Sequence, residues 1–205
     1  VDSYLWYGGG AKKDFKKVSA DAKENSLNFA NLLDKVAQVN PKLRVRFSTS
    51  NPQDMRVEVI DTMSKYINIC DHIHLPVQSG SSRILKLMNR GYDREEYFKL
   101  VDDIKERIPN CAISMDMIIG FCSETEEDHK KTLSLMDYVT YDFGYIFKYS
   151  VRPNTPAARM EDDVKEDVKQ RRLSEIIKKQ QDHSLLHMQE KLGKTYEVLI
   201  EGISK

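Results

Sequence analysis

The sequence predicts an α/β protein in which a parallel sheet is covered by outer helices. Stretches of strand character alternate along the chain with amphipathic stretches of helical period, which is the order of a repeated β-loop-α unit. One strand candidate, residues 112–121 (AISMDMIIGF), is nearly all apolar, as expected for a strand buried on both faces of a parallel sheet. Right-handed crossovers between such strands place the connecting helices on the outside.

The first half of the chain supplies two strand candidates and two helix candidates. Residues 1–24 are rich in Gly, Lys and Asp, which predicts an exposed loop. From residue 26 to 39 the apolar residues fall on one helical face, and a proline follows just past the end. Alternation of apolar and polar residues predicts a strand at 43–48. This half is completed by a helix that Asp54 caps and that ends near residue 66, and by a strand at 69–77.

In the second half of the chain, capping residues predict helices before and after the remaining strands. A helix is expected at 82–89, closed by Gly91, and Asp93 caps another at 94–107 through a capping box. Thr125 caps a further helix, whose acidic first turn suits the positive end of the helix dipole. The other expected elements are strands at 112–121, 143–149 and 195–200 and a long charged helix at 163–191, with an apolar stripe of Val164, Val168, Leu173, Ile176, Ile177, Leu185, Leu186 and Met188.

Composition predicts a cytoplasmic globular protein without a membrane segment. Of the 205 residues, 40% are hydrophobic and 31% are charged, as in soluble domains. Basic and acidic residues number 32 each, and the resulting net charge of zero argues against a general electrostatic coat for nucleic acid, although a local basic groove stays open. There is no run of about 18 apolar residues, and residues 1–7 lack the basic region and apolar core typical of a signal peptide. The three cysteines form no C-x-x-C pair, so reduced thiols are expected.

Three polar residues are candidates for ligand contacts, and the first of them, Gln78, stands where α/β folds bind ligands, at the carboxyl end of a strand. Gln78 lies where a strand gives way to a tight Gly/Ser turn, and it could instead cap the next helix. Arg90 follows that helix, and it could instead pair with a surface acid. Asp116 is a lone carboxylate in an apolar strand, which is costly without a partner. That partner could be a ligand, backbone amides or a buried arginine such as Arg46.

Two further groups are interpreted as structural. His72 and His74 flank one residue and point to the same face of their strand, where two imidazoles could bind a metal. No third ligand is near, so we expect buried, hydrogen-bonded histidines and no metal site. Tyr145, Phe147 and Tyr149 also share one face, and we expect them to fill the core, the alternative being rings near a flipped-out base.

Several segments together resemble a known family. Residues 74–81 (HLPVQSGS) match a segment of the radical S-adenosylmethionine (SAM) methylthiotransferases, which insert sulfur and a methyl group into tRNA or a ribosomal protein. Residues 192–202 are similar to the opening of the TRAM domain, a small RNA-binding β-barrel. The likeness runs in order along nearly all the chain after residue 42, and it includes RFSTSNP at 46–52, SMDMIIGF at 114–121, ETEED at 124–128 and FKYSVRPNTPAA at 147–158.

The resemblance implies a partial (β/α) barrel and a division of the chain. Residues 1–160 would be the carboxyl-terminal portion of the radical SAM core, 161–192 a linker helix, and 193–205 the first strand of the TRAM barrel. The family usually has Pro-Gly where this chain has Cys122-Ser123, and Pro and Gly where it has Val151 and Asn154.

The resemblance also assigns cofactor contacts. Gln78, Arg90 and Asp116 match positions that contact SAM in related enzymes, and their chemistry agrees. Arg90 suits the SAM carboxylate through a forked pair, Gln78 can donate to and accept from the ribose diol, and Asp116 suits a ribose hydroxyl or the ammonium. Thr49, at the same sheet edge, is a further candidate for the amino-acid part. Lys148 and Arg152 are candidates for RNA phosphate or substrate, and no residue is assigned a catalytic role.

The clusters of this family would have to be held elsewhere. The resemblance implies two 4Fe-4S clusters in the intact protein, one of them in a C-x-x-x-C-x-x-C loop. Cys70, Cys111 and Cys122 do not form such a loop and lie in different strand segments, so they cannot converge on the iron atoms. We therefore expect the chain to be a fragment that is inactive by itself, with the cluster ligands in an upstream part.

For the intact protein the resemblance implies conversion of N6-isopentenyladenosine next to the tRNA anticodon to its 2-methylthio derivative. The expected partners are the tRNA anticodon arm and an electron donor such as a flavodoxin or ferredoxin, and we expect a monomer. Alternatives are action on threonylcarbamoyl-adenosine tRNA or on a ribosomal protein, an RNA-binding module without catalysis, and a non-radical (β/α) enzyme.

Overall fold

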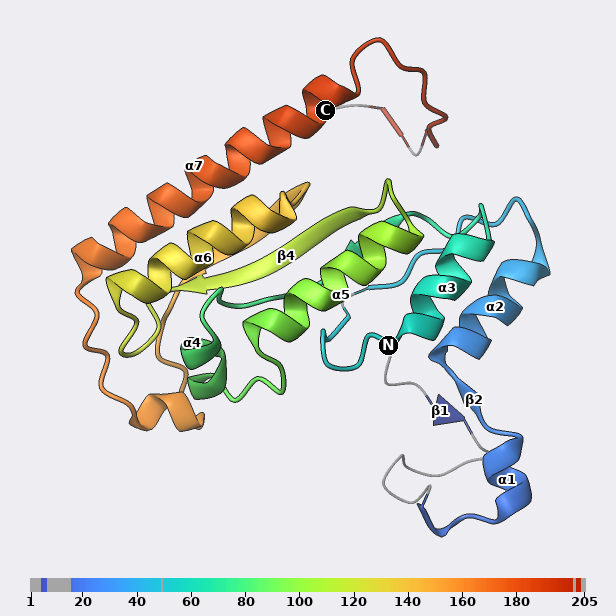
Figure 1. Cartoon of the computed structure of the whole chain (residues 1–205), viewed down its shortest axis with the longest axis horizontal. Helices are drawn as coiled ribbons and strands as arrows, with labels where there is room; N and C mark the ends of the chain where they lie inside the picture. Colours follow the sequence, from blue (N-terminus) through green and yellow to red (C-terminus); the bar gives the residue numbers. More distant parts are fainter. Residues whose placement is uncertain (1–4, 7–15, 49, 201, 204–205) are drawn as a thin grey trace.

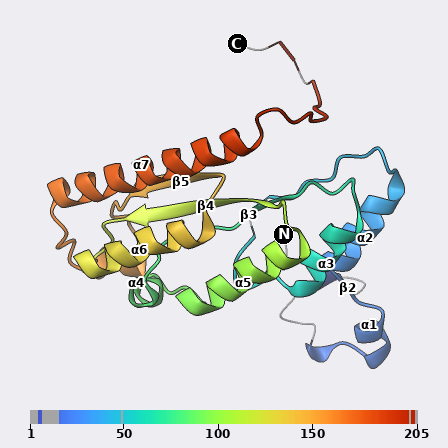
Figure 2. The same ribbon diagram turned by 45° about the horizontal axis from the view of Figure 1, so that its top comes forward.

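A three-stranded parallel sheet forms the centre of the computed structural model, which describes residues 5–6, 16–48, 50–200 and 202–203. The strands lie in the order β3 (His72–His74), β4 (Ala112–Ile119) and β5 (Phe143–Lys148). Connecting helices α5 (Arg94–Arg107) and α6 (Glu126–Val139) lie on the same side of the sheet, as Figures 1 and 2 show. The predicted α/β class with parallel strands is therefore confirmed.

One face of β4 carries the core. Ile113, Met115, Met117 and Ile119 alternate along the strand, and each is at most 2% exposed. They belong to one apolar cluster with Tyr97 and residues of α5 and α6. Because side chains alternate across a strand, the residues between them point to the opposite face. That face carries Ser114, Asp116 and Ile118.

The first part of the chain differs from the prediction in three places. The expected strand at 43–48 is not formed, and Val45 makes only an isolated parallel bridge with Ile69. The segment predicted as an exposed loop contains the short helix α1 (Ala20–Glu24) and strand β1 (Leu5–Trp6), which pairs antiparallel with β2 (Leu27–Asn28). Alternation of side chains alone does not make a strand, because a strand also needs a continuous partner.

Local capping signals place several helix starts. Thr125 forms the expected cap of α6, where its hydroxyl accepts from the Asp128 amide. Asp93 and Glu96 form the expected capping box of α5. Helix α2 (Phe29–Val39) starts later than expected, at an Asn28 cap. Helix α3 (Val57–Lys65) follows Arg56, so the expectation that Asp54 caps it is wrong.

The segment after β3 is held between β4 and α6. Gln78 extends the sheet through a parallel bridge with Met117. The Gly80 amide donates to Thr132 Oγ1 at 3.0 Å. Helix α4 (Ser82–Leu87) then runs shorter than expected. Asn89, with φ +56°, takes the left-handed conformation that we expected of Gly91, since Asn tolerates it better than most residues.

The long charged helix α7 (Glu166–Glu190) lies alongside β5 and α6 (Figure 2). Its expected apolar stripe is only partly correct, because Ile177, Leu185, Leu186 and Met188 are exposed. The buried positions of the helix are instead Lys169, Arg172, Ile176, Gln180 and His183. Long polar side chains can bury their stems when their heads find partners.

Two further findings concern the chain after β5. The 3₁₀ helix η2 (Pro156–Arg159) follows that strand. The predicted strand at 195–200 is not formed in the structure. No helix in the described part of the chain is long and apolar enough to cross a membrane.

The close approach of Gly80 to α6 yields a stability prediction. A Cβ at Gly80 would lie 2.4 Å from Thr132 Cα and 2.6 Å from Lys131 O, and neither backbone atom can rotate away. We expect Gly80→Ala to lower the free energy of unfolding by about 1–3 kcal/mol, the usual cost of overpacking. The measurement is urea denaturation, with Gly202→Ala as control, because nothing lies within 4 Å of a Cβ there. Equal stability of the two variants would contradict the packing argument.

Candidate functional site

A cavity of about 590 Å³ lies at the carboxyl ends of the strands. In Figure 2 the arrowhead of β4 points to this end, beside α4. Its size is in the range of small-molecule sites, about 300–1,000 Å³. The cavity brings together every described residue that we predicted for cofactor or substrate: Gln78, Arg90, Asp116, Lys148 and Arg152. The remaining lining residues are Leu87, Met88, Asn89, Ile118, Phe121, Phe147, Tyr149, Ser150, Thr155, Pro156 and Ala157.

Gln78 and Asp116 are neighbours because their backbones pair. The Gln78 amide donates to Asp116 O, and the Ile118 amide donates to Gln78 O, each at 2.9 Å. Gln78 has φ +69°, which is a costly conformation for a residue with a Cβ. Its residue surface is 7% exposed, and its side-chain amide makes no hydrogen bond within the described residues. The amide therefore keeps its full donor and acceptor capacity for a ligand.

Asp116 faces a histidine. His74 Nε2 lies 3.4 Å from Asp116 Oδ1, and a third of the carboxylate side chain is exposed to the cavity side. In the part of the chain that the structure describes, neither a backbone amide nor Arg46 is its partner, although the sequence left both open. One carboxylate oxygen is engaged by His74, which leaves the group able to accept hydrogen bonds from a ligand.

The two strand histidines are hydrogen-bonded, as predicted, but they are half-buried and not buried. His72 Nε2 lies 3.0 Å and His74 Nδ1 2.9 Å from the hydroxyl of Ser114 on β4. Burial lowers the pKa of His72 below its usual value, and the nearby Arg46 charge acts in the same direction. Among the described residues, no group of three or more His, Cys, Asp or Glu is placed to hold a metal ion.

The cationic candidates differ in whether their side chains already make an ion pair. Arg90 is exposed and makes no ion pair within the described residues, so its guanidinium is available. Arg152 is also exposed and without an ion pair in this part of the chain. Lys148 pairs with Glu166 at the start of α7, so a substrate would have to displace that contact. Thr49 lies outside the described residues.

The prediction that Tyr145, Phe147 and Tyr149 fill the core is wrong for the first two. Tyr149, just after β5, is partly buried against Phe121. Tyr145 and Phe147 are 56% and 55% exposed, and Phe143 shares their face. The register explains this, because Tyr145 is paired with Asp116 and so lies on the face of the sheet that the helices do not cover. Phe147 and Tyr149 line the cavity.

Arg83 of α4 is hydrogen-bonded to the turn after β4 and to the first turn of α6. Its guanidinium donates to Ser123 O at 2.6 Å and to Asp128 Oδ2 at 2.5 Å. Asp128 also accepts from the Ser81 hydroxyl at 2.6 Å and from Thr125. Sequence reasoning recognised Asp128 only as part of the ETEED match and did not predict its partners. The sequence does contain one signal for this contact: Asp128 is the third residue of the helix that Thr125 caps, where a carboxylate is typical of a capping box.

The electrostatics of Asp128 follow from these contacts. Burial alone would raise the pKa of this carboxyl. Hydrogen bonds from Arg83, Ser81 and Thr125 outweigh burial and hold the pKa well below its usual 3.8. Asp128 is therefore ionised across the range in which proteins normally work.

A second ionic tie fixes the turn after β4 to α7. Glu124 accepts from the Gly120 amide at 3.1 Å and from Arg172 at 2.9 Å. Both side chains of this ion pair are at most 5% exposed. Burial raises the pKa of Glu124 above its usual value, and the Arg172 charge opposes that rise. The turn that carries Phe121 into the cavity wall is thus held by a buried ion pair.

The two departures from the family pattern share one backbone feature. Ser123 has φ +61° and Asn154 has φ +65°, the left-handed region that glycine enters without cost. These are the positions where the family usually has glycine. The chain keeps the left-handed turns there with a serine, whose hydroxyl and carbonyl both accept from Arg83, and with an asparagine.

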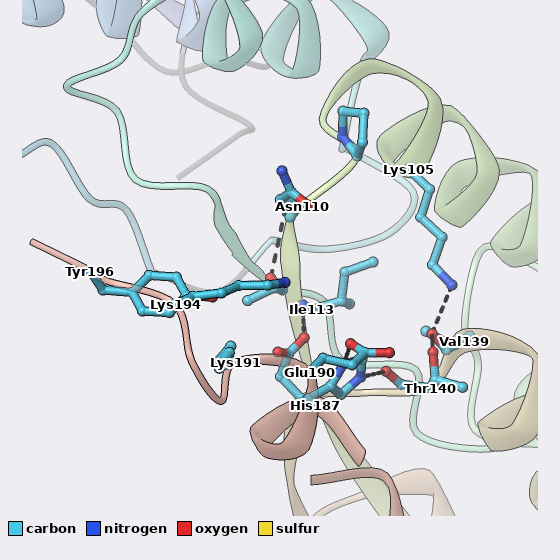
Figure 3. Close-up of a pocket in the computed structure, with 14 residues that line it drawn as sticks. Lys105, Asn110, Ile113, Val139, Thr140, His187, Glu190, Lys191, Lys194 and Tyr196 are labelled. Carbon is cyan, nitrogen blue, oxygen red and sulfur yellow. Dashed lines mark hydrogen bonds and ion pairs between the residues drawn. The ribbon is translucent and has the colours of Figure 1, made fainter. Parts of the chain in front are cut away.

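A second cavity, of about 660 Å³, lies at the amino end of β4, as Figure 3 shows. Its polar groups largely satisfy one another. Lys105 donates to Val139 O at 2.8 Å, and His187 Nε2 lies 2.6 Å from Thr140 O. This end of a parallel sheet usually serves stability, whereas ligands bind at the carboxyl end. The cavity with Gln78 and Asp116 is therefore the candidate site.

The cysteines do not meet at either cavity. Cys111 directly precedes β4 and Cys122 follows it, so the strand separates them. Cys122 is buried against Ile84 and Phe121, and all three cysteines are free thiols. They cannot jointly ligate one cluster, because cluster thiolates must converge on the iron atoms.

Comparison with known proteins adds a family and close relatives. Residues 8–136 match the model of the radical SAM superfamily. The whole chain is 62% identical to the tRNA-2-methylthio-N(6)-dimethylallyladenosine synthase of Christiangramia forsetii and 57% identical to that of Flavobacterium johnsoniae. The synthase of Chloroherpeton thalassium is 57% identical over 93% of the chain. The chain spans 43% of the length of each relative, which is less than half.

A solved structure supports the fold. Coproporphyrinogen III oxidase from Escherichia coli, described as a radical SAM enzyme, matches 77% of this chain and 38% of its own. The TM-score is 0.60 at 23% sequence identity. This likeness supports the partial (β/α) barrel that the sequence predicted.

The contacts of Asp128 yield a prediction on stability. We expect Asp128→Asn to lower the free energy of unfolding at pH 7 by about 2–3 kcal/mol, because a buried charged acceptor of several hydrogen bonds is lost. The folded pKa of Asp128 is depressed, so its contribution is complete above the unfolded pKa and is lost as pH falls through the folded value. The gap between wild type and variant should therefore narrow below about pH 4.

The measurement is chemical denaturation between pH 7 and pH 3. Asp182→Asn is the control, because that carboxylate makes only an exposed ion pair with Lys178. A gap between wild type and Asp128→Asn that stays constant down to pH 3 would contradict the ionic role.

Proposed function

The chain belongs to the radical SAM superfamily, and we propose that its cavity at the carboxyl edge binds S-adenosylmethionine for a tRNA methylthiotransferase. The observation that carries this proposal is the meeting of Gln78, Arg90 and Asp116 in one cavity, although they come from three different segments. The family implies SAM and an iron–sulfur cluster as cofactors in general.

The residues of the cavity fit the groups of SAM. The unpaired Gln78 amide can both donate to and accept from a ribose diol. Arg90 offers a free guanidinium for the carboxylate in forked geometry. Asp116 offers a carboxylate for a hydroxyl or for the ammonium, and apolar residues such as Ile118 and Phe121 line the same cavity. Together these residues would bind and orient the cofactor and exclude water from it.

SAM and a reduced cluster, when bound, supply one-electron chemistry that can break an unreactive C–H bond. We propose that the intact protein holds two 4Fe-4S clusters. Their ligands would lie outside this chain, because its three cysteines are dispersed. The chain's own part is to hold SAM and to present the substrate to it.

The proposed substrate is tRNA. The relatives named as synthases act, by their names, on N6-dimethylallyladenosine in tRNA, and they are up to 62% identical over the whole chain. We propose the same substrate here, recognised at the anticodon arm, with Arg152 and Lys148 as candidate phosphate contacts at the cavity mouth. The protein would work in the cytoplasm, where tRNA is modified, as a monomer with a flavodoxin or ferredoxin as electron donor.

Binding of SAM tests the site directly. We expect Gln78→Ala, Arg90→Ala and Asp116→Asn each to weaken SAM binding by the full-length protein roughly 10- to 100-fold, the loss of one or two charge-assisted hydrogen bonds. Equilibrium dialysis measures the affinity. Arg44→Ala is the control, since Arg44 is an exposed arginine that lines neither described cavity. Unchanged affinity in all three variants would remove the cavity as the SAM site.

The substrate is tested in cells. Mass spectrometry of tRNA nucleosides should show loss of the 2-methylthio derivative of isopentenyladenosine and accumulation of its precursor when the intact gene is deleted. Re-expression of the wild-type gene should restore the modified nucleoside, and the Asp116→Asn gene should not. An unchanged nucleoside profile on deletion would move the threonylcarbamoyl-adenosine or ribosomal-protein substrate to first place.

A further inference from the structure

A row of four polar side chains runs along the open face of the sheet toward the cavity. Its members, in order, are His72, Ser114, His74 and Asp116. Ser114 Oγ lies 3.0 Å from His72 Nε2 and 2.9 Å from His74 Nδ1, and His74 Nε2 lies 3.4 Å from Asp116 Oδ1. The proposed function uses only the last member of this row.

The strand register creates the row. His74 is paired with Ser114 across the β3–β4 ladder, and His72 is two residues before His74 on the same face. Asp116 is two residues after Ser114, so all four side chains project from one side of the sheet. Their contacts are therefore set by the backbone pairing.

Ser114 fixes where the protons lie. It is completely buried and has imidazole nitrogens within hydrogen-bond distance, and a buried hydroxyl with such acceptors in reach donates to one of them. Within the described residues, the acceptors in reach are His72 Nε2 and His74 Nδ1. At least one of these two imidazole nitrogens must therefore carry no proton.

For a neutral His74, the position of Asp116 selects between the two. A bare nitrogen lone pair facing a carboxylate would be repulsive, so His74 Nε2 carries the proton on that side. In neutral His74 the other nitrogen, Nδ1, is then the bare one, and it accepts the Ser114 hydroxyl. Ser114 Oγ in turn accepts from His72 Nε2–H. The Ser114 hydroxyl and His72 Nε2–H then each have an acceptor, and His74 Nε2–H faces the Asp116 carboxylate at ion-pair distance.

We propose that His74 is a positioning residue for Asp116, and that Ser114 holds His74 as the neutral Nε2–H tautomer. The ordered row, His72 to Ser114 to His74 to Asp116, keeps the carboxylate aimed at the cavity. This inference rests on the proposed role of Asp116 in binding SAM.

Two exposed aromatic residues cover the row. Phe143 stacks on His72 with ring centroids 5.6 Å apart, and Tyr145 meets His74 edge to face at 6.2 Å. Both rings belong to the open face of β5, and core packing was predicted from the sequence for Tyr145. They restrict the access of water to the imidazoles, which strengthens the hydrogen bonds beneath them.

The proton positions can be observed directly. Neutron diffraction from deuterium-exchanged crystals of the full-length protein at pH 8 should show deuterium on His74 Nε2, none on His74 Nδ1, and the Ser114 hydroxyl pointing to Nδ1. Deuterium on His74 Nδ1, alone or together with Nε2, would overturn the proposal. This readout does not depend on SAM binding.

Matched variants test the consequence for the cofactor. Gln at position 74 can place an amide donor near the Nε2 position, whereas Asn can mimic only the Nδ1 side. We therefore expect His74→Asn to weaken SAM binding about tenfold, and His74→Gln to restore most of that loss. Equal affinities of the two variants would contradict the positioning role.

The Ser114 contribution has a control in the same protein. Ser50 is also completely buried, and its hydroxyl has no hydrogen-bond partner among the described residues. We expect Ser114→Ala to weaken SAM binding several-fold and to allow deuterium on His74 Nδ1, and Ser50→Ala to do neither. If both serine variants bind equally, Ser114 does not act through His74.

The failures of the two hypotheses are distinguishable. If Asp116→Asn leaves SAM affinity unchanged, the proposed site is wrong whatever the proton positions are. If Asp116→Asn weakens binding and His74→Asn does not, the site stands and the positioning role of His74 falls.

Discussion

The backbone pairing of Gln78 with β4 is the constraint on which the site depends. Two hydrogen bonds, from the Gln78 amide to Asp116 O and from the Ile118 amide to Gln78 O, carry the sheet past the end of β3. They place Gln78 beside Asp116 and force the chain into a left-handed turn at Gln78. Such strain persists only where surrounding contacts over-determine the conformation, and here the close contact of Gly80 with α6 does so.

Buried charges hold the walls of the cavity. Asp128 gathers Ser81, Arg83 and Thr125, and Glu124 pairs with Arg172 of α7. Desolvation offsets much of the attraction in such pairs, so their net contribution to stability is small, but the loss of one partner is costly. Their effect is to specify which loops lie against which helices. Lys169 and Arg172 of α7 can be buried because each pairs with a carboxylate, Asp162 or Glu124.

The two faces of the sheet have separate tasks. The face toward the helices is apolar and closed, and it supplies the core through Met115 and its neighbours. The open face carries the histidine row, Asp116 and the aromatic residues of β5. One strand, β4, therefore belongs to both the core and the site, because successive side chains point to opposite sides. This is why a carboxylate could occur inside a segment that is otherwise apolar.

The sequence by itself determined the α/β class, the β4 strand, the caps of α5 and α6, and the candidates Gln78, Arg90 and Asp116. Each of these follows from periodicity, caps or motifs, which depend only on residues close together in the sequence. Only the tertiary structure decided that the cavity unites these candidates, that His74 faces Asp116, that the 43–48 and 195–200 segments form no strands, and that Tyr145 is exposed. Each of these depends on which distant segments pair: a strand needs a partner, and the burial of a face depends on what covers it. Periodicity along one segment shows neither which segment it pairs with nor what covers its face.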